Sequence, residues 1–304
     1  MVIPTHDRPA GLARLLTALG SQSLAAERFE VIVVDDGSAV SAGIAGDGPA
    51  LRVIRHEWPR GPGAARNSGW RVATTPIVAF IDDDCVPTPG WLEAVLAAAR
   101  SAGEEVVIQG RVEPMPDQRA HLNPLSHTIE VTGASRLFVS ANIVYPRSLL
   151  EHLGGFDERF ARAGEDADLG ARAVKAGARA TFAPDALVHH EVRGMSLRDH
   201  VRHTLKWTDA VGAVAIHPEL RTLLTLRLFW KPTHLWLLAG AAAVVRRRPL
   251  LAAAAAVPYV AHYRRLYEGD SRALARALPA HLAIDVCEIA TAVAGSARHR
   301  TLML

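Results

Sequence analysis

Hydrophobic positions in the first 115 residues switch repeatedly between two patterns. Continuous apolar runs at residues 30–34 and 77–81 are typical of strands buried on both faces. Elsewhere apolar residues recur every three or four positions, as the leucines of residues 12–19 do, which indicates one face of a helix. This alternation predicts βαβ units, and therefore an α/β fold with a Rossmann-like, mostly parallel sheet flanked by helices. The expected strands cover residues 1–5, 30–34, 51–55, 77–81 and 106–108, and further helices begin at Pro62 and Pro89.

A second block, residues 136–194, continues the same alternation and completes the domain that we place at residues 1–195. The remaining residues, 196–304, read as a helical extension. Within the second block we expect a strand near residues 137–139, a turn at residues 154–158, a helix from Gly164 to Gly177, and a strand at residues 178–182 that leads to His189 and His190.

The apolar run at residues 77–81 ends in three consecutive carboxylates, Asp82, Asp83 and Asp84. Ionised carboxylates at the end of a buried strand repel one another and lose solvation unless a cation neutralises them. Clustered oxygen ligands suit Mg²⁺ or Mn²⁺, which commonly binds substrate phosphates as well. The alternative for this motif alone is a solvated acidic turn before Pro87.

Polar residues also follow two other expected strands. Residues 5–8 come after the first strand, and Asp35 and Asp36 come after the second. In parallel sheets, ligands bind beyond the carboxyl ends of the strands. Three strands that deliver polar groups to one edge therefore predict a ligand site there.

Two further groups of candidate residues have ordinary explanations as well as functional ones. Glu165 and Asp166 begin a helix, where acidic side chains complement the helix dipole and cap free amides. His189 and His190 follow a strand end and are candidate metal ligands, although a histidine is more often a packed or solvated residue.

Six short motifs occur in a fixed order along two-thirds of the chain. They are Ile3-Pro4-Thr5, residues 33–38 (VVDDGS), Ala65-Arg66-Asn67, Asp82-Asp83-Asp84, residues 154–158 (GGFDE) and Gly164-Glu165-Asp166. In this order they resemble the family 2 glycosyltransferases. That resemblance implies the GT-A fold, which is one α/β domain around a nucleotide-sugar site, and an inverting transfer of a sugar to an acceptor hydroxyl.

The resemblance implies a nucleotide-binding side of the site. Thr5 and Asp36 would border the nucleotide base, where a carboxylate can accept a hydrogen bond from a ring N–H such as that of uracil. Pro4 and Arg8 would also contact the nucleotide sugar. Arg66 would support the base or the diphosphate, because a planar guanidinium suits either. The expected donor is therefore a nucleoside-diphosphate sugar, with a UDP-sugar first.

The resemblance also implies a metal. Asp82 and Asp83 would contact the nucleotide sugar, Asp82 near the ribose, while Asp84 and His190 would hold Mg²⁺ or Mn²⁺ at the diphosphate. Such an ion stabilises the charge that develops on the leaving nucleoside diphosphate. Because Asp83 is itself acidic, the D-x-D pattern leaves open which of the three carboxylates meets the ion.

The catalytic residues implied by the resemblance lie at the start of the helix after Gly164. Asp166, next to Glu165, would be the general base that takes the proton of the acceptor hydroxyl as it attacks the anomeric carbon. A single displacement of this kind inverts the anomeric configuration.

Other functions are associated with different sequence motifs. Residues 202–207 do not match the Q-x-x-R-W pattern of processive polysaccharide synthases, which favours transfer of one or a few sugars. Residues 61–66 lack the third glycine of a dinucleotide fingerprint, and no G-x-x-x-x-G-K-[ST] phosphate loop occurs. Two alternatives stay open, a sugar-nucleotide nucleotidyltransferase and a catalytically degenerate module that only binds.

The C-terminal third differs from the rest in charge and apolar content. Residues 221–304 carry twelve Lys and Arg against four Asp and Glu, whereas the whole chain has a net charge of only +3. Two apolar stretches, residues 228–245 and 249–263, fall short of the roughly 20 apolar residues of a spanning helix. Aromatic residues and arginines flank them, which favours helices in the headgroup region of a membrane. Packing on the catalytic domain or on a second copy in a homo-oligomer, and true spanning, are the alternatives.

Cysteine usage and charge set the compartment and the partners that we expect. Cys85 and Cys287 give no disulfide framework and no C-x-x-C pair, which favours a reducing cytoplasmic setting. The basic, apolar C-terminal third favours an anionic membrane over nucleic acid as its neighbour. We therefore expect a cytoplasmic enzyme bound to the inner face of the cell membrane, acting on a lipid-linked or other cell-envelope glycan.

Overall fold

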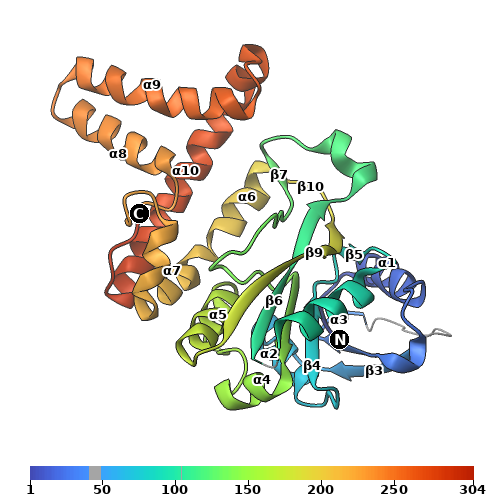
Figure 1. Cartoon of the computed structure of the whole chain (residues 1–304). Helices are drawn as coiled ribbons and strands as arrows, with labels where there is room; N and C mark the ends of the chain where they lie inside the picture. The colour runs from blue at the N-terminus through green and yellow to red at the C-terminus, as the bar shows by residue number, and fades with distance from the viewer. Residues whose placement is uncertain (41–48, 104) are drawn as a thin grey trace. The chain divides into compact units, whose positions relative to one another are not determined.

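The computed structural model describes residues 1–40, 49–103 and 105–304, and the chain forms two compact units (Figure 1). The first unit comprises Met1–His121 and His127–Arg193, and the second comprises Leu122–Ser126 and Gly194–Leu304. That the first unit carries catalysis and the second carries association with a membrane stays a prediction.

The first unit is built on a sheet whose strand order is β3-β2-β1-β4-β8-β6-β9-β5. Parallel pairing joins β3, β2, β1 and β4, and also joins β6 and β9. The β8 and β5 strands run antiparallel to their neighbours. The expected mostly parallel α/β sheet is therefore confirmed, with two antiparallel strands that make it mixed. The strands are β1 (Val2–Thr5), β2 (Glu30–Asp35), β3 (Ala50–Arg55), β4 (Ile77–Ile81), β5 (Cys85–Pro87), β6 (Val106–Pro114), β8 (Asn142–Pro146) and β9 (Arg179–His190).

Helices cover both faces of this sheet, as Figure 1 shows. The leucines of α1 pack with Trp91 of α3 in one core, as their helical spacing predicts. Burial of each leucine stabilises the folded state by about 1.5–3 kcal/mol. A second core on the opposite face contains Trp70 of α2 and Leu169 of α5. The two cores fix the sheet between helix layers. One layer holds α1 (Pro9–Gly20) and α3 (Trp91–Ala102), and the other holds α2 (Pro62–Trp70), α4 (Arg147–Leu153) and α5 (Glu165–Lys175).

The strand expected near residues 137–139 is wrong, because β8 begins only at Asn142. Phe138 is buried with a φ of +49°, which is incompatible with an extended strand. Its ring lies directly over Gly170 of α5, where an added Cβ would come within 2.0 Å of it. Phe138 is therefore hydrophobic because it packs on a helix, and not because it belongs to a strand. Smaller differences are the start of α3 at Trp91 instead of Pro89, and the additional strand β5.

The second unit is helical. Ser196 caps α6 by accepting a hydrogen bond from the Asp199 amide at 3.2 Å, and Asp270 caps α10 in the same way. The helices are α6 (Leu197–Thr204), α7 (Trp207–Ile216), α8 (Pro232–Val245), α9 (Pro249–Leu266) and α10 (Ser271–His299). Short elements elsewhere are η1 (Ala26–Arg28), η2 (Pro116–His121), η3 (Pro218–Leu223), β7 (Ser126–His127) and β10 (Arg193–Gly194).

Among the described residues, α10 alone is long and apolar enough to cross a membrane by length and composition. It has 29 residues, and its most apolar window has a mean hydropathy of 1.4 with 33% of that window buried. The apolar stretches noted in the sequence form the shorter helix α8 and the proline-containing helix α9. One such helix is weak support for a membrane span, since the core helix of a soluble protein passes the same test.

Candidate active site

The three aspartates form the turn between β4 and β5 at the carboxyl edge of the sheet. The Cys85 amide donates to the Asp82 carbonyl at 3.0 Å and closes this turn. Helix α1 packs against it at Gly11, where an added Cβ would lie only 2.6 Å from the Asp83 carbonyl oxygen. Glycine at this position therefore allows α1 to approach the backbone of the acidic turn.

Asp83 is held by residues that follow β1. The Thr5 hydroxyl donates to Asp83 Oδ2 at 2.7 Å, and Arg8 Nη1 lies 3.3 Å from Asp83 Oδ1. Burial raises the pKa of Asp83 to about 6, although Thr5 and Arg8 both oppose this shift. The structure thus joins Thr5, Arg8 and Asp83, three of the residues expected to bind the nucleotide sugar. Pro4 lies one residue earlier, in β1 opposite Val34 of β2.

Asp84 faces a set of cationic groups. Arg8 Nη1 contacts its Oδ2, His190 Nε2 lies 3.4 Å from its Oδ1, and Arg193 Nη2 lies 3.6 Å from its Oδ2. Burial alone would raise the pKa of Asp84, but His190, Arg8 and Arg193 together hold it below its usual range. Asp84 is therefore a carboxylate that stays ionised and attracts cations.

Strand pairing decides which of the two histidines reaches Asp84. In the antiparallel β5–β9 pair, His190 lies opposite Cys85, whereas His189 lies opposite Val86 and points to the other face. The closest contact of His190 Nδ1 is the Glu191 carbonyl oxygen at 2.8 Å, shorter than its 3.3 Å contacts with Thr128 and Ile129. Nε2 is therefore the ring nitrogen that faces Asp84, while Nδ1 lies against the Glu191 carbonyl and the Ile129 amide.

These donors fit a divalent cation. Asp84 and His190 supply a carboxylate oxygen and an imidazole nitrogen, a combination that suits Mn²⁺ and related ions. The Cys85 sulfur lies in the same cluster. Burial, and then the three neighbouring aspartates, raise the pKa of the Cys85 thiol well above its usual value. Cys85 is therefore a protonated core residue and a poor ligand.

Arg66 connects the acidic turn to the start of α5. Its side chain is 4% exposed, its Nη2 donates to Asp82 Oδ1 at 2.7 Å, and its Nη1 donates to Glu165 Oε1 at 2.9 Å. Both terminal nitrogens thus contact carboxylates, whereas the sequence places Arg66 against the base or diphosphate. Arg66 Nε and Glu165 Oε2 are buried without a hydrogen-bond partner among the described residues.

Asp166 lies in the first turn of α5 and is half-buried. Its Oδ1 accepts a hydrogen bond from the Ala167 amide at 2.8 Å. Burial, and then the neighbouring Glu165 carboxylate, raise the pKa of Asp166 to about 7, and Arg66 opposes the shift. Burial and the Asp166 carboxylate also raise the pKa of Tyr145, a buried phenol in β8. A carboxylate with a pKa near neutrality is well matched to accepting a proton.

Asp36 anchors the loop that precedes α2. Its two oxygens accept hydrogen bonds from the backbone amides of Arg60 at 2.9 Å and Gly61 at 2.8 Å. His56 Nδ1 lies 2.6 Å from Asp36 Oδ1. Gly61 has a φ of +95°, and an added Cβ would lie 2.5 Å from the Ala161 carbonyl. Any contact of Asp36 with a base would therefore come in addition to its structural contacts.

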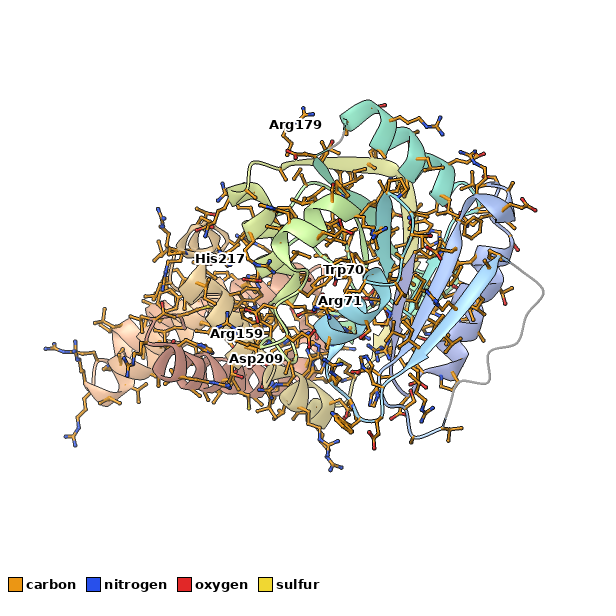
Figure 2. The ribbon with its side chains drawn as sticks, turned by 90° about the horizontal axis from the view of Figure 1, so that it is seen from below. Trp70, Arg71, Arg159, Arg179, Asp209 and His217 are labelled. Atoms are coloured by element: carbon orange, nitrogen blue, oxygen red, sulfur yellow. The ribbon has the colours of Figure 1, made fainter. Side chains whose placement is uncertain are left out.

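Asn67, next to Arg66, holds the loop before α5. Its amide group accepts from the Phe156 amide and donates to the Phe156 carbonyl, both at 2.9 Å. Trp70 Nε1 also donates to Asn67 Oδ1 at 2.8 Å, and Trp70 and Arg71 lie side by side at the end of α2 (Figure 2). Asn67 thus anchors the loop before α5, next to Arg66.

Three residues of this site were not predicted from the sequence, namely His56, Tyr145 and Arg193. Arg193 lies three residues after His190, so the histidine could have drawn attention to it. His56 and Tyr145 come to the site only through the pairing of β3 and β8 within the sheet.

Known protein families and individual proteins resemble this chain in sequence. The model of glycosyl transferase family 2 matches residues 1–146, and that of glycosyl transferase family group 2 matches residues 77–264, more than half of the chain. The chain is 34% identical to a pre-mycofactocin glycosyltransferase of Mycobacterium tuberculosis over 234 residues, which is 72% of this chain and 48% of the relative. It is 30% identical to a validoxylamine A glucosyltransferase of Streptomyces hygroscopicus, over 57% of this chain and 50% of the relative. The chain thus spans about half the length of these relatives.

Solved structures share the fold. A mannosyltransferase from Pyrobaculum calidifontis, in complex with GDP-Man and Mn²⁺, matches 97% of this chain and 85% of its own with a TM-score of 0.59 at 21% identity. TarS of S. aureus matches 90% of both chains with a TM-score of 0.52 at 18% identity. From the family models and this shared architecture we conclude that the chain belongs to the family 2 glycosyltransferases and has the GT-A fold.

Proposed function

We propose that this chain is a metal-dependent, inverting glycosyltransferase that moves a sugar from a nucleoside-diphosphate sugar to an acceptor hydroxyl. One observation carries the proposal. Arg66 links Asp82, in the turn that contains Asp84, to Glu165, the neighbour of Asp166. One buried arginine thus joins the turn that carries Asp84 to the helix start that carries Asp166.

On the donor side, Asp84 and His190 would hold Mn²⁺ or Mg²⁺. When bound, the ion would supply positive charge to the diphosphate that leaves. Arg8 and Arg193 lie against Asp84 and add guanidinium groups that suit phosphate oxygens. Related folds are described with GDP-Man and Mn²⁺ and, for TarS, with UDP-GlcNAc, which supports a nucleotide-sugar donor. We expect a UDP-sugar.

On the acceptor side, Asp166 would take the hydroxyl proton. As the acceptor oxygen forms its bond to the anomeric carbon, the bond from that carbon to the nucleoside diphosphate breaks, and its electrons leave with the diphosphate. The proton ends on Asp166, and the configuration at the anomeric carbon inverts. The pKa of about 7 would let Asp166 accept this proton near neutral pH.

The second unit would bring the enzyme to its acceptor. Exposed aliphatic side chains around the α8–α9 turn, such as Val245 and Leu250, flank the arginines at residues 246–248. Apolar and basic groups side by side suit an anionic lipid surface. We therefore propose a lipid-linked or other envelope glycan as acceptor, reached from the cytoplasmic face of the membrane.

The family match removes the reason to favour a nucleotidyltransferase, and Asp84, His190 and Asp166 together argue against a module that only binds. The test is to incubate the purified chain with a panel of nucleotide sugars and a membrane extract, and to measure the released nucleoside diphosphate. We expect release with one donor class, dependence on Mn²⁺ or Mg²⁺, and a radiolabelled sugar in the lipid fraction. Release of pyrophosphate, or full activity in EDTA, would contradict the proposal.

A further inference from the structure

A second cluster of a histidine and carboxylates lies inside the C-terminal unit, between α8 and α10. His234 Nε2 lies 3.1 Å from Glu288 Oε2 and 3.9 Å from Asp285 Oδ1. The side chains of His234 and Asp285 are 0% exposed, and that of Glu288 is 9% exposed. One donor atom from each residue lies within 4.8 Å of the others. Nothing in the proposed transfer reaction uses these residues.

Asp285, like His234 at Nδ1, has a buried side-chain atom without a hydrogen-bond partner among the described residues. Its Oδ2 accepts a hydrogen bond from the Tyr263 hydroxyl of α9 at 2.8 Å. Its Oδ1 is buried and has no hydrogen-bond partner among the described residues. This oxygen points into the cluster, where Lys231 Nζ at 3.7 Å and His234 Nε2 at 3.9 Å are both too far for a hydrogen bond. A buried carboxylate oxygen without a hydrogen bond is costly, and a cation closer than the Lys231 ammonium at 3.7 Å would relieve that cost.

We propose that His234, Asp285 and Glu288 form a binding site for a divalent cation of the Zn²⁺ class. Imidazole nitrogen and carboxylate oxygen bind Zn²⁺ at about 2.0–2.2 Å, and ligands at that range stand roughly 3–4 Å apart. His234 Nε2 lies at such a distance from both carboxylates, and all three donor atoms lie within 4.8 Å of one another. Two carboxylates balance the charge of a divalent ion. Mg²⁺ fits less well, because it prefers oxygen ligands and keeps several waters.

Lys231 competes with this ion. Its ammonium lies 2.6 Å from Glu288 Oε2, but its side chain is 35% exposed and is free to turn toward water. Either the lysine ammonium or the metal ion can therefore neutralise the carboxylates of this site. Removing the ammonium should strengthen metal binding, which a purely structural ion-pair network does not predict.

The ion would fasten the beginning of α8 to the middle of α10. His234 is in the first turn of α8, while Asp285 and Glu288 are one turn apart on α10. Tyr263 of α9 orients Asp285 from the opposite side, as outer partners of metal ligands commonly do. This role is structural, and it does not depend on the function proposed for the first unit.

The test uses the full chain without a histidine tag, stripped with EDTA and dialysed, and titrated with Zn²⁺ alone. Asp84→Asn serves as the background, because it removes the carboxylate of the active-site pair. Bound zinc is measured by calorimetry and by elemental analysis, and Mg²⁺ is the control ion. We expect one Zn²⁺ per chain in this background, loss of that equivalent on adding Glu288→Gln, and about tenfold tighter binding on adding Lys231→Met.

Absence of zinc binding in the Asp84→Asn background would overturn the proposal, and so would an equivalent that survives Glu288→Gln. If Glu288→Gln fails to fold by circular dichroism, Lys231→Met decides alone, since this side chain is partly exposed. An unchanged Zn²⁺ affinity in Lys231→Met would then reduce the cluster to an ion-pair network.

Discussion

The two histidine–carboxylate clusters of this chain differ in how they are surrounded. Asp84 and His190 lie at the carboxyl edge of the sheet, where Arg8 and Arg193 contact Asp84 with guanidinium groups that suit phosphate. His234, Asp285 and Glu288 lie between helices, with the tyrosines of α9 beside them and Lys231 as the neighbouring cation. The first arrangement suits an ion shared with a substrate, and the second suits an ion that holds helices together. Cluster composition alone would not distinguish these uses, but the neighbouring residues do.

The largest effect should come from Asp84→Asn. Removing the carboxylate would weaken the binding of the divalent ion and the neutralisation of the leaving diphosphate. Stabilisation of several kcal/mol is lost in such cases, so we expect about a thousandfold lower kcat/KM. Glu93→Gln, an exposed acidic position on α3, is the matched control and should keep the wild-type rate. Comparable rates for the two variants would contradict the assignment of Asp84.

Asp166→Asn should lower kcat by about a hundredfold to a thousandfold, because it removes the general base and keeps the size of the side chain. Donor affinity should change little, since the residue would act on the acceptor. Binding of the donor is measured by calorimetry, and transfer by product formation. A large loss of donor affinity would instead place Asp166 on the donor side.

The pH profile should follow Asp166. Only the ionised carboxylate accepts a proton, so kcat should fall about tenfold for each pH unit below the pKa of about 7 and level off above it. The raised pKa also means that ionisation destabilises the folded state as the pH rises from the unfolded value toward 7. Asp166→Asn should therefore raise the free energy of unfolding more at pH 8 than at pH 5. An acid limb that is unchanged in Asp166→Glu and Asp166→Asn would assign it to another group.

Gly11→Ala should disturb the acidic turn. The added Cβ would meet the Asp83 carbonyl oxygen at 2.6 Å, so α1 or the turn must shift. We expect the free energy of unfolding to fall by about 1–3 kcal/mol and activity to fall with it. Gly20→Ala in the same helix is the control, because an added Cβ there meets no atom within 4 Å. Equal urea unfolding midpoints for the two variants would contradict this prediction, because α1 would then accommodate the added methyl group.

The smallest effect on activity should come from the C-terminal cluster. Glu288→Gln removes the charge that pairs with Lys231 and contacts His234, so the free energy of unfolding should fall by about 1–3 kcal/mol. Glu268→Gln, at an exposed position just before α10, should change it by less than about 0.5 kcal/mol. Stability that is the same in both variants would mean that this cluster does not fasten α8 to α10.

Sequence patterns predicted elements where local and tertiary preferences agree. The leucines of α1 and the apolar run of β4 form the expected elements because both are buried on the faces that their spacing indicates. Phe138 failed as a strand residue because its partner is Gly170, 32 positions away along the chain. No sequence pattern predicted the contact of Asp36 with His56, or those of Arg66 with Asp82 and Glu165. Such contacts depend on how the sheet and α5 assemble.

The choice of His190 over His189 as the neighbour of Asp84 also depends on tertiary structure. His189 and His190 are adjacent in sequence, and only the β5–β9 register separates their roles. In the C-terminal third, the spacing of Asp285 and Glu288 reads as ordinary helix polarity. Their burial opposite His234 emerges only when α8 packs on α10.

The most direct test of the account is the Mn²⁺ dependence of nucleoside-diphosphate release by the wild-type chain and by Asp84→Asn. The account predicts that chelation stops release, that added Mn²⁺ restores it in the wild-type chain, and that Asp84→Asn stays inactive at the same Mn²⁺ concentration. A wild-type rate that persists in EDTA would contradict it.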